Sequence, residues 1–132
     1  NYLILGSDAH GKNYSLLLGN NGSVRLAPLY DIASLLPYTP RPRDQRLSMR
    51  IDRAYRDDQI KPCHFERMAR QCEYSYAQLY QTIQEYLHKI PELSKNLCAE
   101  LHQKGMRHPI LRTLNKNLQQ RCTTIAQEFQ KT

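Results

Sequence analysis

Two polar segments near the start of the chain are separated by a stretch that has the pattern of a β-hairpin. Asp8 and Asn13 lie five residues apart, and Asp31 follows Asn13 after a further eighteen residues. A hairpin returns the chain close to the point where it left, so this order predicts that the three polar side chains converge. No other feature of the sequence constrains its fold and its chemistry as strongly.

The hairpin is predicted from a turn signal between two short runs. Tyr14–Leu18 forms the first run, Asn20–Gly22 is typical of the turns that close hairpins, and Val24–Pro28 forms the returning strand. Asp31 is therefore expected at a strand end, just before the apolar run Ile32–Leu36.

An Asp, an Asn and a second Asp in this order are the polar set of a phosphoryl-transfer site. In kinases the first Asp accepts the proton of the attacking hydroxyl, and the Asn and second Asp hold the Mg²⁺ that bridges the nucleotide phosphates. The alternative is that Asp8 and Asn13 are turn residues and that Asp31 caps a helix. Their order around a hairpin favours the phosphoryl-transfer site.

The motifs that contain these residues resemble those of a known family. Asp-x-His-x-Lys-Asn at 8–13 and Leu-Ala-Pro-Leu-Tyr-Asp-Ile at 26–32 are similar to motifs of the HipA-like serine/threonine kinases, the toxins of bacterial toxin–antitoxin modules. The resemblance is close over 1–34 and continues in Leu47–Ile51, Tyr55-Arg56 and His64-Phe65. It implies a mainly α fold, the C-terminal lobe of a kinase, in which a catalytic-loop β-hairpin near the N-terminus precedes a bundle of about three to five helices.

The resemblance also implies roles for single residues. Asp8 corresponds to the catalytic base, and Asn13 and Asp31 correspond to the ligands of Mg²⁺. Two loop residues between the base and the Asn resemble residues that lie against the phosphates of ATP, and the tyrosine before the second Asp supports the nucleotide pocket. The residues implied to bind ATP are His10, Lys12, Asn13, Tyr30 and Asp31.

The implied activity is transfer of the γ-phosphate of ATP to a cellular protein, with aminoacyl-tRNA synthetases as the targets that the family suggests. A HipB-like DNA-binding antitoxin is the implied partner, and it would bring the chain near operator DNA. The net charge of +7 permits such contact, and Arg67 and Arg70 are the candidate residues. Two alternatives stay open: the lobe of a small-molecule or lipid kinase, and a non-catalytic basic helical module that binds DNA or protein.

Two parts of a kinase site have no counterpart in the sequence. The loop over the phosphates and the Lys that pairs with them precede the catalytic loop in kinases, whereas Gly6 is the only glycine before Asp8. We therefore expect 1–132 to be the C-terminal portion of a kinase domain and to be inactive alone. Its expected parts are the catalytic loop, hairpin and metal-binding Asp (1–36), a basic loop like an activation segment (37–58) and a helical subdomain (59–132).

The predicted basic loop is rich in Pro and Arg. Pro37, Pro40 and Pro42 indicate an extended, non-helical segment. Within it, Arg46–Ile51 alternates polar and apolar residues, which predicts a half-buried strand with Met49 among its inward residues. By position this segment would receive a protein substrate, and the alternative is a solvated basic loop.

The remaining sequence has helical periodicity. Pro62 suits the first turn of one helix, and Ser75–Gln78 is a plausible capping box for the next. Pro91 is expected to kink or break that second helix, the pattern stops at Gly105, and Pro109 opens the last helix. The clearest periodicity belongs to the last helix, at Leu111, Leu114, Leu118, Cys122, Ile125 and Phe129.

The cysteines and the composition indicate an intracellular protein with reduced thiols. Cys72, Cys98 and Cys122 stand on apolar helix faces and, with no CxxC pair, are expected to be buried free thiols rather than disulfides or zinc ligands. His88 and His102 are expected to be solvated. No apolar run approaches the roughly 20 residues of a membrane span, and we expect a cytoplasmic protein.

Overall fold

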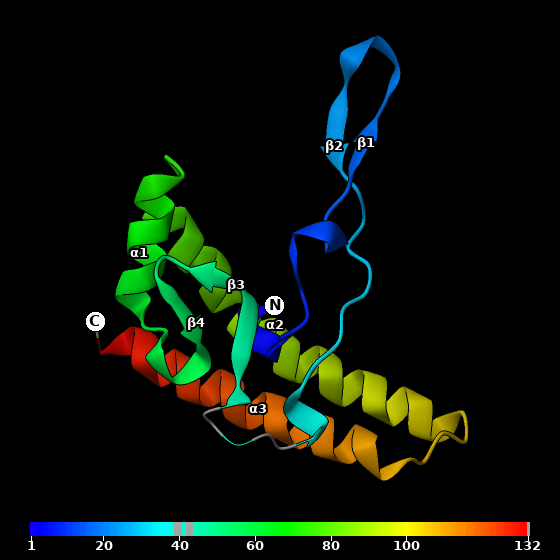
Figure 1. Cartoon of the computed structure of the whole chain (residues 1–132). Coiled ribbons are helices and arrows are strands. Elements are labelled where there is room, and N and C mark those ends of the chain that lie inside the picture. Colours follow the sequence, from blue (N-terminus) through cyan, green and yellow to red (C-terminus); the bar gives the residue numbers. More distant parts are fainter. Residues whose placement is uncertain (39–40, 42–43, 132) are drawn as a thin grey trace.

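Three α-helices make up most of the structure, a computed structural model that describes residues 1–38, 41 and 44–131. They are α1 (Pro62–Gln71), α2 (Tyr76–Gln103) and α3 (Pro109–Gln130). The helices α2 and α3 lie side by side as an antiparallel pair, and α1 packs against α2 (Figure 1). The mainly α fold predicted from the sequence is confirmed.

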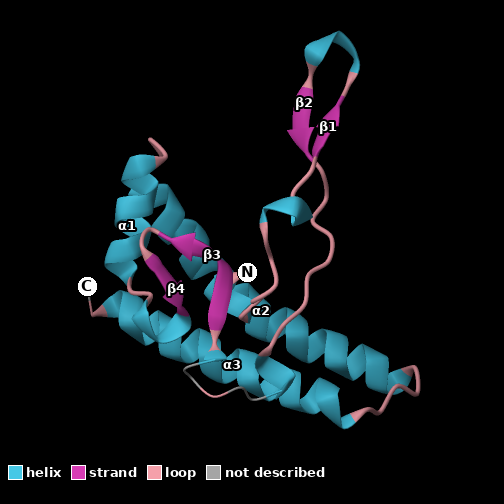
Figure 2. Ribbon diagram, in the orientation of Figure 1, coloured by secondary structure: helices cyan, strands magenta, loops and turns pink. Residues whose placement is uncertain are grey.

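Two antiparallel hairpins complete the structure. In the first, β1 (Leu16–Leu18) pairs with β2 (Val24–Leu26), and in the second, β3 (Arg46–Ile51) pairs with β4 (Ala54–Arg56). The first hairpin projects away from the helices, whereas the second lies against them (Figures 1 and 2).

The strand predicted in the basic loop is present over the same residues, but one of its side chains points differently. Leu47 and Ile51 are buried, as the alternation predicts, whereas Met49 is 49% exposed. The pairing of β3 with β4 shifts register between Arg46 and Ile51, so the middle of the strand, where Met49 lies, is not regularly paired and its side chain is less covered than those of the two residues that flank it. The prediction for Met49 is therefore wrong.

A single apolar core joins the second hairpin to all three helices. Phe65 of α1 is at its centre: its ring lies 5.1 Å from that of Tyr2 and 5.6 Å from that of Phe129, measured between centroids. Tilted and edge-on aromatic pairs add to the stabilisation from apolar burial. The buried members of this core are Tyr2, Leu47, Ile51, Ala54, Ile60, Phe65, Ile83, Leu87, Cys122, Ile125 and Phe129.

Pro91 does not end the second helix, and the expectation of a break there is wrong. α2 continues from Tyr76 to Gln103 through the proline. An internal proline removes one helical hydrogen bond and costs about 3 kcal/mol. Packing against α3 offsets that cost, because Leu87 is buried one turn before the proline and Ser94, one turn after it, donates to Asn115 Oδ1 of α3 at 2.8 Å.

The other predicted helix boundaries are confirmed. Pro62 and Pro109 are the first residues of α1 and α3, and the Ser75 side chain accepts the backbone N–H of Gln78 at 3.4 Å. Gly105 follows the end of α2 with a φ of 86° and donates its N–H to the carbonyl of His102 at 3.0 Å. This left-handed conformation is the reason a glycine stands there.

Two expectations about single residues need correction. Pro37 lies in a short 3₁₀ turn (Leu36–Tyr38) rather than in extended chain, while Pro40 and Pro42 lie outside the described residues. The described cysteines are free thiols, but Cys72 is exposed because α1 ends one residue before it.

The other cysteines and the histidines for which exposure was predicted differ in how far they are buried. Cys98 is half-buried, Cys122 is buried, and burial raises the pKa of the Cys122 thiol. His88 and His102 are exposed, as predicted. Within the described residues, none of the helices combines the length and the apolar character needed to cross a membrane.

One buried charged side chain connects three parts of the fold. Arg121 of α3 bonds both carboxylate oxygens of Asp57 at 2.6 Å and donates to the carbonyls of Tyr2 and Leu3. The side chains of Arg121 and Asp57 are only 10% and 15% exposed. Each charge has its partner and the geometry is bidentate, so neither is left uncompensated.

Replacement of this arginine should strongly destabilise the fold. Arg121→Ala leaves Asp57 and two carbonyls without their donor, and we expect the free energy of unfolding to fall by about 3–5 kcal/mol. Urea denaturation followed by circular dichroism measures the change. Arg70→Ala is the matched control, because Arg70 forms an exposed ion pair with Glu66 and its loss should cost less than about 1 kcal/mol. Equal effects of the two substitutions would contradict the prediction.

Candidate catalytic and metal-binding site

The first hairpin brings its two ends together. Leu16 pairs with Leu26, and the ladder extends by one more bond, in which the Ala27 N–H donates to the Ser15 carbonyl at 2.8 Å. The residues just before and just after the hairpin therefore emerge next to each other, at the end nearer the helices (Figure 2).

Asn13 and Asp31 meet at this base of the hairpin. The Asn13 Nδ2 donates to Asp31 Oδ2 at 2.8 Å, and Asn13 Oδ1 accepts the backbone N–H of His10 at 3.2 Å. Only the amide oxygen can accept from an N–H and only the amide nitrogen can donate to a carboxylate, so both contacts require the same orientation of the amide. Asn13 is buried, and its side chain is thereby fixed.

The oxygens of this pair fit the preferences of Mg²⁺. Asn13 Oδ1 keeps a second lone pair, and Asp31 Oδ1 makes no hydrogen bond with any described residue. Such hard oxygens are Mg²⁺ ligands, and one or two from the protein are enough when water and phosphate complete the shell. The described residues contain no group of three or more His, Cys, Asp or Glu that could hold a metal, so a magnesium site here would depend on this pair.

Asp31 has an unusual backbone conformation. Its φ is 55°, in the left-handed region that residues other than glycine adopt at a cost. Conformations of this kind cluster at active sites and ligand clamps, where the surrounding structure holds them. Here the bond from Asn13 supplies part of that support.

Tyr30 ties the returning chain to the loop before the hairpin. Its hydroxyl donates to the Lys12 carbonyl at 2.8 Å and lies 2.9 Å from Ser15 Oγ. Tyr30 is 47% exposed. The structure thus gives Tyr30 a positioning role in the loop, and its contact with nucleotide stays a prediction.

The segment before Asp8 is held by backbone bonds on two sides. The Ser7 carbonyl accepts both the N–H of Ser48, at 3.0 Å, and its hydroxyl, at 2.6 Å. The Leu5 carbonyl accepts the Leu35 N–H at 3.1 Å. Ser48 belongs to β3, so the second hairpin fixes the backbone on which Asp8 begins the loop.

The side chains of Asp8, His10 and Lys12 are all exposed. Among the described residues, neither the Asp8 carboxylate nor the Lys12 ammonium has a hydrogen-bond or ion-pair partner. The structure therefore joins Asn13 and Asp31 directly, and it leaves Asp8, on the same loop, bonded to neither. Ser48 is the positioning residue that sequence reasoning missed, because it lies 41 residues from its partner and no pattern marks it.

One face of the first hairpin carries four exposed apolar side chains. Leu16, Leu18, Val24 and Leu26 keep between 55% and 79% of their surface in solvent. Leu16 pairs with Leu26 and Leu18 with Val24, and residues paired across a ladder point to the same face, so these four side chains form one exposed apolar surface. Leu17, on the opposite face, is 40% exposed. A two-stranded hairpin alone is marginally stable, and exposed apolar patches mark contact surfaces.

Comparison with known proteins places this site in a family context. The family model described as HipA-like C-terminal domain matches residues 1–94, which include both hairpins, α1 and most of α2. The fold also matches a chain in the solved complex of HipA, HipB and operator DNA from the toxin–antitoxin system of Shewanella oneidensis MR-1, with a TM-score of 0.75 and 23% identity. That match covers 98% of this chain and 30% of the other, so the chain spans less than a third of the length of that relative.

The contact network at the base of the hairpin can be tested by removing its central amide. Asn13→Ala takes away the acceptor of the His10 N–H, and we expect the amide hydrogen of His10 to exchange at least about tenfold faster, the equivalent of roughly 1.4 kcal/mol. Nuclear magnetic resonance measures that rate. Asn20→Ala, at the exposed tip of the hairpin, should leave it unchanged. Unchanged protection of His10 in Asn13→Ala would show that the amide does not hold the loop.

Proposed function

Because the chain belongs to the family of HipA-like C-terminal domains, we propose that it supplies the catalytic and metal-binding side of an ATP-dependent serine/threonine kinase site. The observation that carries this proposal is that Asn13, on the loop that also bears Asp8, meets Asp31, with 2.8 Å between Asn13 Nδ2 and Asp31 Oδ2. Their residue types and order are those that phosphoryl transfer requires.

Each side chain has a distinct part in the proposed reaction. Asp8 accepts the proton of the substrate hydroxyl as its oxygen attacks the γ-phosphate of ATP. Asn13 Oδ1 and the Asp31 carboxylate would hold Mg²⁺, which would supply positive charge against the phosphates. His10 and Lys12, both exposed on the same loop, lie along the phosphates. Tyr30 keeps this loop against the returning strand.

In this proposal, the loop over the phosphates and the Lys that pairs with them would come from further polypeptide of the parent protein. The chain matches 30% of its solved relative, and the exposed leucines of the first hairpin give that further polypeptide an apolar surface to cover. A kinase holds ATP between a loop over the phosphates and a catalytic loop. In the proposed arrangement, the further polypeptide covers the first hairpin, and the catalytic loop then faces the loop over the phosphates.

The parent protein, in this proposal, is the toxin of a toxin–antitoxin module in the cytoplasm. Its partners are a HipB-like antitoxin and a protein substrate, with an aminoacyl-tRNA synthetase as the class that the resemblance suggests. A solved relative that is a complex with HipB and operator DNA supports the antitoxin and a contact with DNA. Of the two candidate arginines, Arg70 is the better suited to phosphates, because its side chain is 79% exposed and its partner Glu66 is also exposed, whereas Arg67 is 51% exposed and pairs with the buried Asp52.

Substitution of the two aspartates in the full-length protein tests the proposal. Asp8→Asn removes the base and Asp31→Ala removes a metal ligand, and each should lower the rate of phosphoryl transfer by about 10²-fold or more. Transfer of radiolabelled γ-phosphate to protein and inhibition of growth are the two measurements. Asp58→Asn, in an exposed ion pair with Arg56, should leave both unchanged. Normal transfer by Asp31→Ala would overturn the assignment and favour a non-catalytic module.

The isolated chain should fold but should not bind ATP tightly. The core from Tyr2 to Phe129 is internal to the 132 residues, whereas the nucleotide would meet only one side of its site. We expect helical circular dichroism with cooperative melting and, by calorimetry with magnesium and ATP, no binding at low micromolar affinity. Tight binding or kinase activity of this chain alone would show that it carries a complete site.

A further inference from the structure

The end of α2, the loop after it and most of α3 carry a concentration of positive charge. Residues 93–127 include six Lys and Arg against a single Glu, whereas the whole chain has a net charge of +7. Glu100 is already paired with Lys104, and Arg121 with Asp57. The cations of this region that have no ion-pair partner among the described residues are Lys95, Arg107, Arg112 and Lys116.

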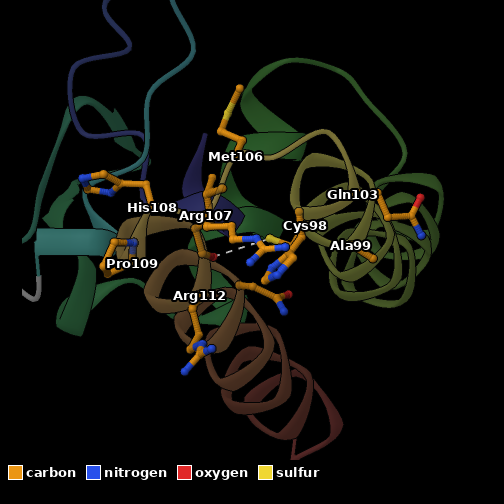
Figure 3. Close-up of a pocket in the computed structure, with 11 residues that line it drawn as sticks. Cys98, Ala99, Gln103, Met106, Arg107, His108, Pro109 and Arg112 are labelled. Carbon is orange, nitrogen blue, oxygen red and sulfur yellow. Dashed lines mark hydrogen bonds between the residues drawn. The ribbon is translucent and has the colours of Figure 1, made fainter.

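The two arginines among these cations, Arg107 and Arg112, line a pocket where α2 ends and α3 begins (Figure 3). Its volume is about 590 Å³, within the range of small-molecule sites in proteins. Figure 3 shows Ala99 and Gln103 on one helix, Pro109 and Arg112 on the other, and Arg107 between them. The family model ends at residue 94, and no step of the proposed kinase reaction uses this pocket.

The side chains of this pocket that can carry charge are all basic, so they would attract an anion. Arg107, Arg112, His102 and His108 line it, and its lining contains no Asp or Glu. The first turn of α3 also has no acidic residue, so the positive end of the helix dipole is not compensated there. His108 Nδ1 accepts the Ile110 N–H at 3.2 Å, which leaves the proton of the neutral ring on Nε2, free to donate.

Apolar groups form the rest of the lining. Cys98, Ala99, Met106 and Leu111 contribute to it, and the Cys98 thiol is turned to the Leu111 carbonyl at 3.5 Å. Met106 is 53% exposed, and its flexible thioether can adapt to an aromatic ring. A pocket that combines unpaired guanidinium groups with an apolar wall suits a ligand with two different ends.

We propose that this pocket binds a small anion in which a phosphate group is joined to an aromatic or other apolar part. The planar guanidinium of Arg107 or Arg112 can bond two phosphate oxygens at once, a geometry that lysine cannot offer. The apolar part would lie against Met106 and Leu111. A compact ligand fits a concave pocket of this volume better than the extended backbone of a nucleic acid does.

Titration of the isotope-labelled chain with phenyl phosphate, followed by nuclear magnetic resonance, tests the proposal. We expect saturable shifts of the Arg107 and Arg112 side chains and of the backbone amides of 106–112, with weaker binding of inorganic phosphate and of phenol. Arg107→Gln and Arg112→Gln should each weaken binding at least about tenfold, the loss of one charged hydrogen-bonding group. Both arginines are exposed, so neither substitution should change the melting temperature.

A matched variant and a second ligand separate the proposal from general attraction of anions. Arg53→Gln removes an exposed arginine from the turn between β3 and β4 and should leave the affinity unchanged. Equal weakening by Arg53→Gln, shifts spread over the whole basic surface, or equal binding of phenyl and inorganic phosphate would overturn the proposal. If duplex DNA shifts the two arginines and phenyl phosphate does not, the surface binds nucleic acid instead.

Discussion

The guanidinium of Arg121 is the contact on which the rest of the structure depends. It lies on α3, but its partners are Asp57, just after the second hairpin, and the carbonyls of Tyr2 and Leu3 at the start of the chain. The first residues have little secondary structure of their own, so these bonds, together with the packing of the Tyr2 ring on Phe65, hold them against the helices. Five residues after Leu3 the same segment reaches Asp8, and the position of the proposed base therefore depends on an arginine far along the chain.

A short series of hydrogen bonds to backbone carbonyls connects the packed helices to the proposed site. Ser48 of the second hairpin holds the Ser7 carbonyl, and β3, to which it belongs, is anchored in the core by Leu47 and Ile51. Beyond this point the fold gives less support, because the first hairpin projects from the helices with its apolar side chains exposed (Figure 1). The loop of Asp8 and Asn13 thus lies between the apolar core and a hairpin whose apolar side chains are exposed.

Local features of the structure could be predicted from the sequence, whereas most contacts between residues far apart in the sequence could not. Gly105 marked a helix end because a left-handed residue is needed there, and the hairpin order predicted that Asn13 and Asp31 would meet. Pro91 misled, since packing against α3 outweighs the preference of a proline to end a helix. The three-residue strand β4 is too short to leave a periodic pattern, and nothing local indicates that Arg121 would bond Asp57, 64 residues away.

The two aspartates of the proposed site lie in different surroundings, and this difference fits two different roles. Asp31 is held by the Asn13 amide in a left-handed backbone conformation, and a fixed carboxylate suits the role of metal ligand that we propose for it. Asp8 is exposed and is bonded to neither of them, so its carboxylate can approach a hydroxyl that arrives with the substrate. The local structure therefore supports the order of roles that the motif implies, with Asp31 binding and Asp8 reacting.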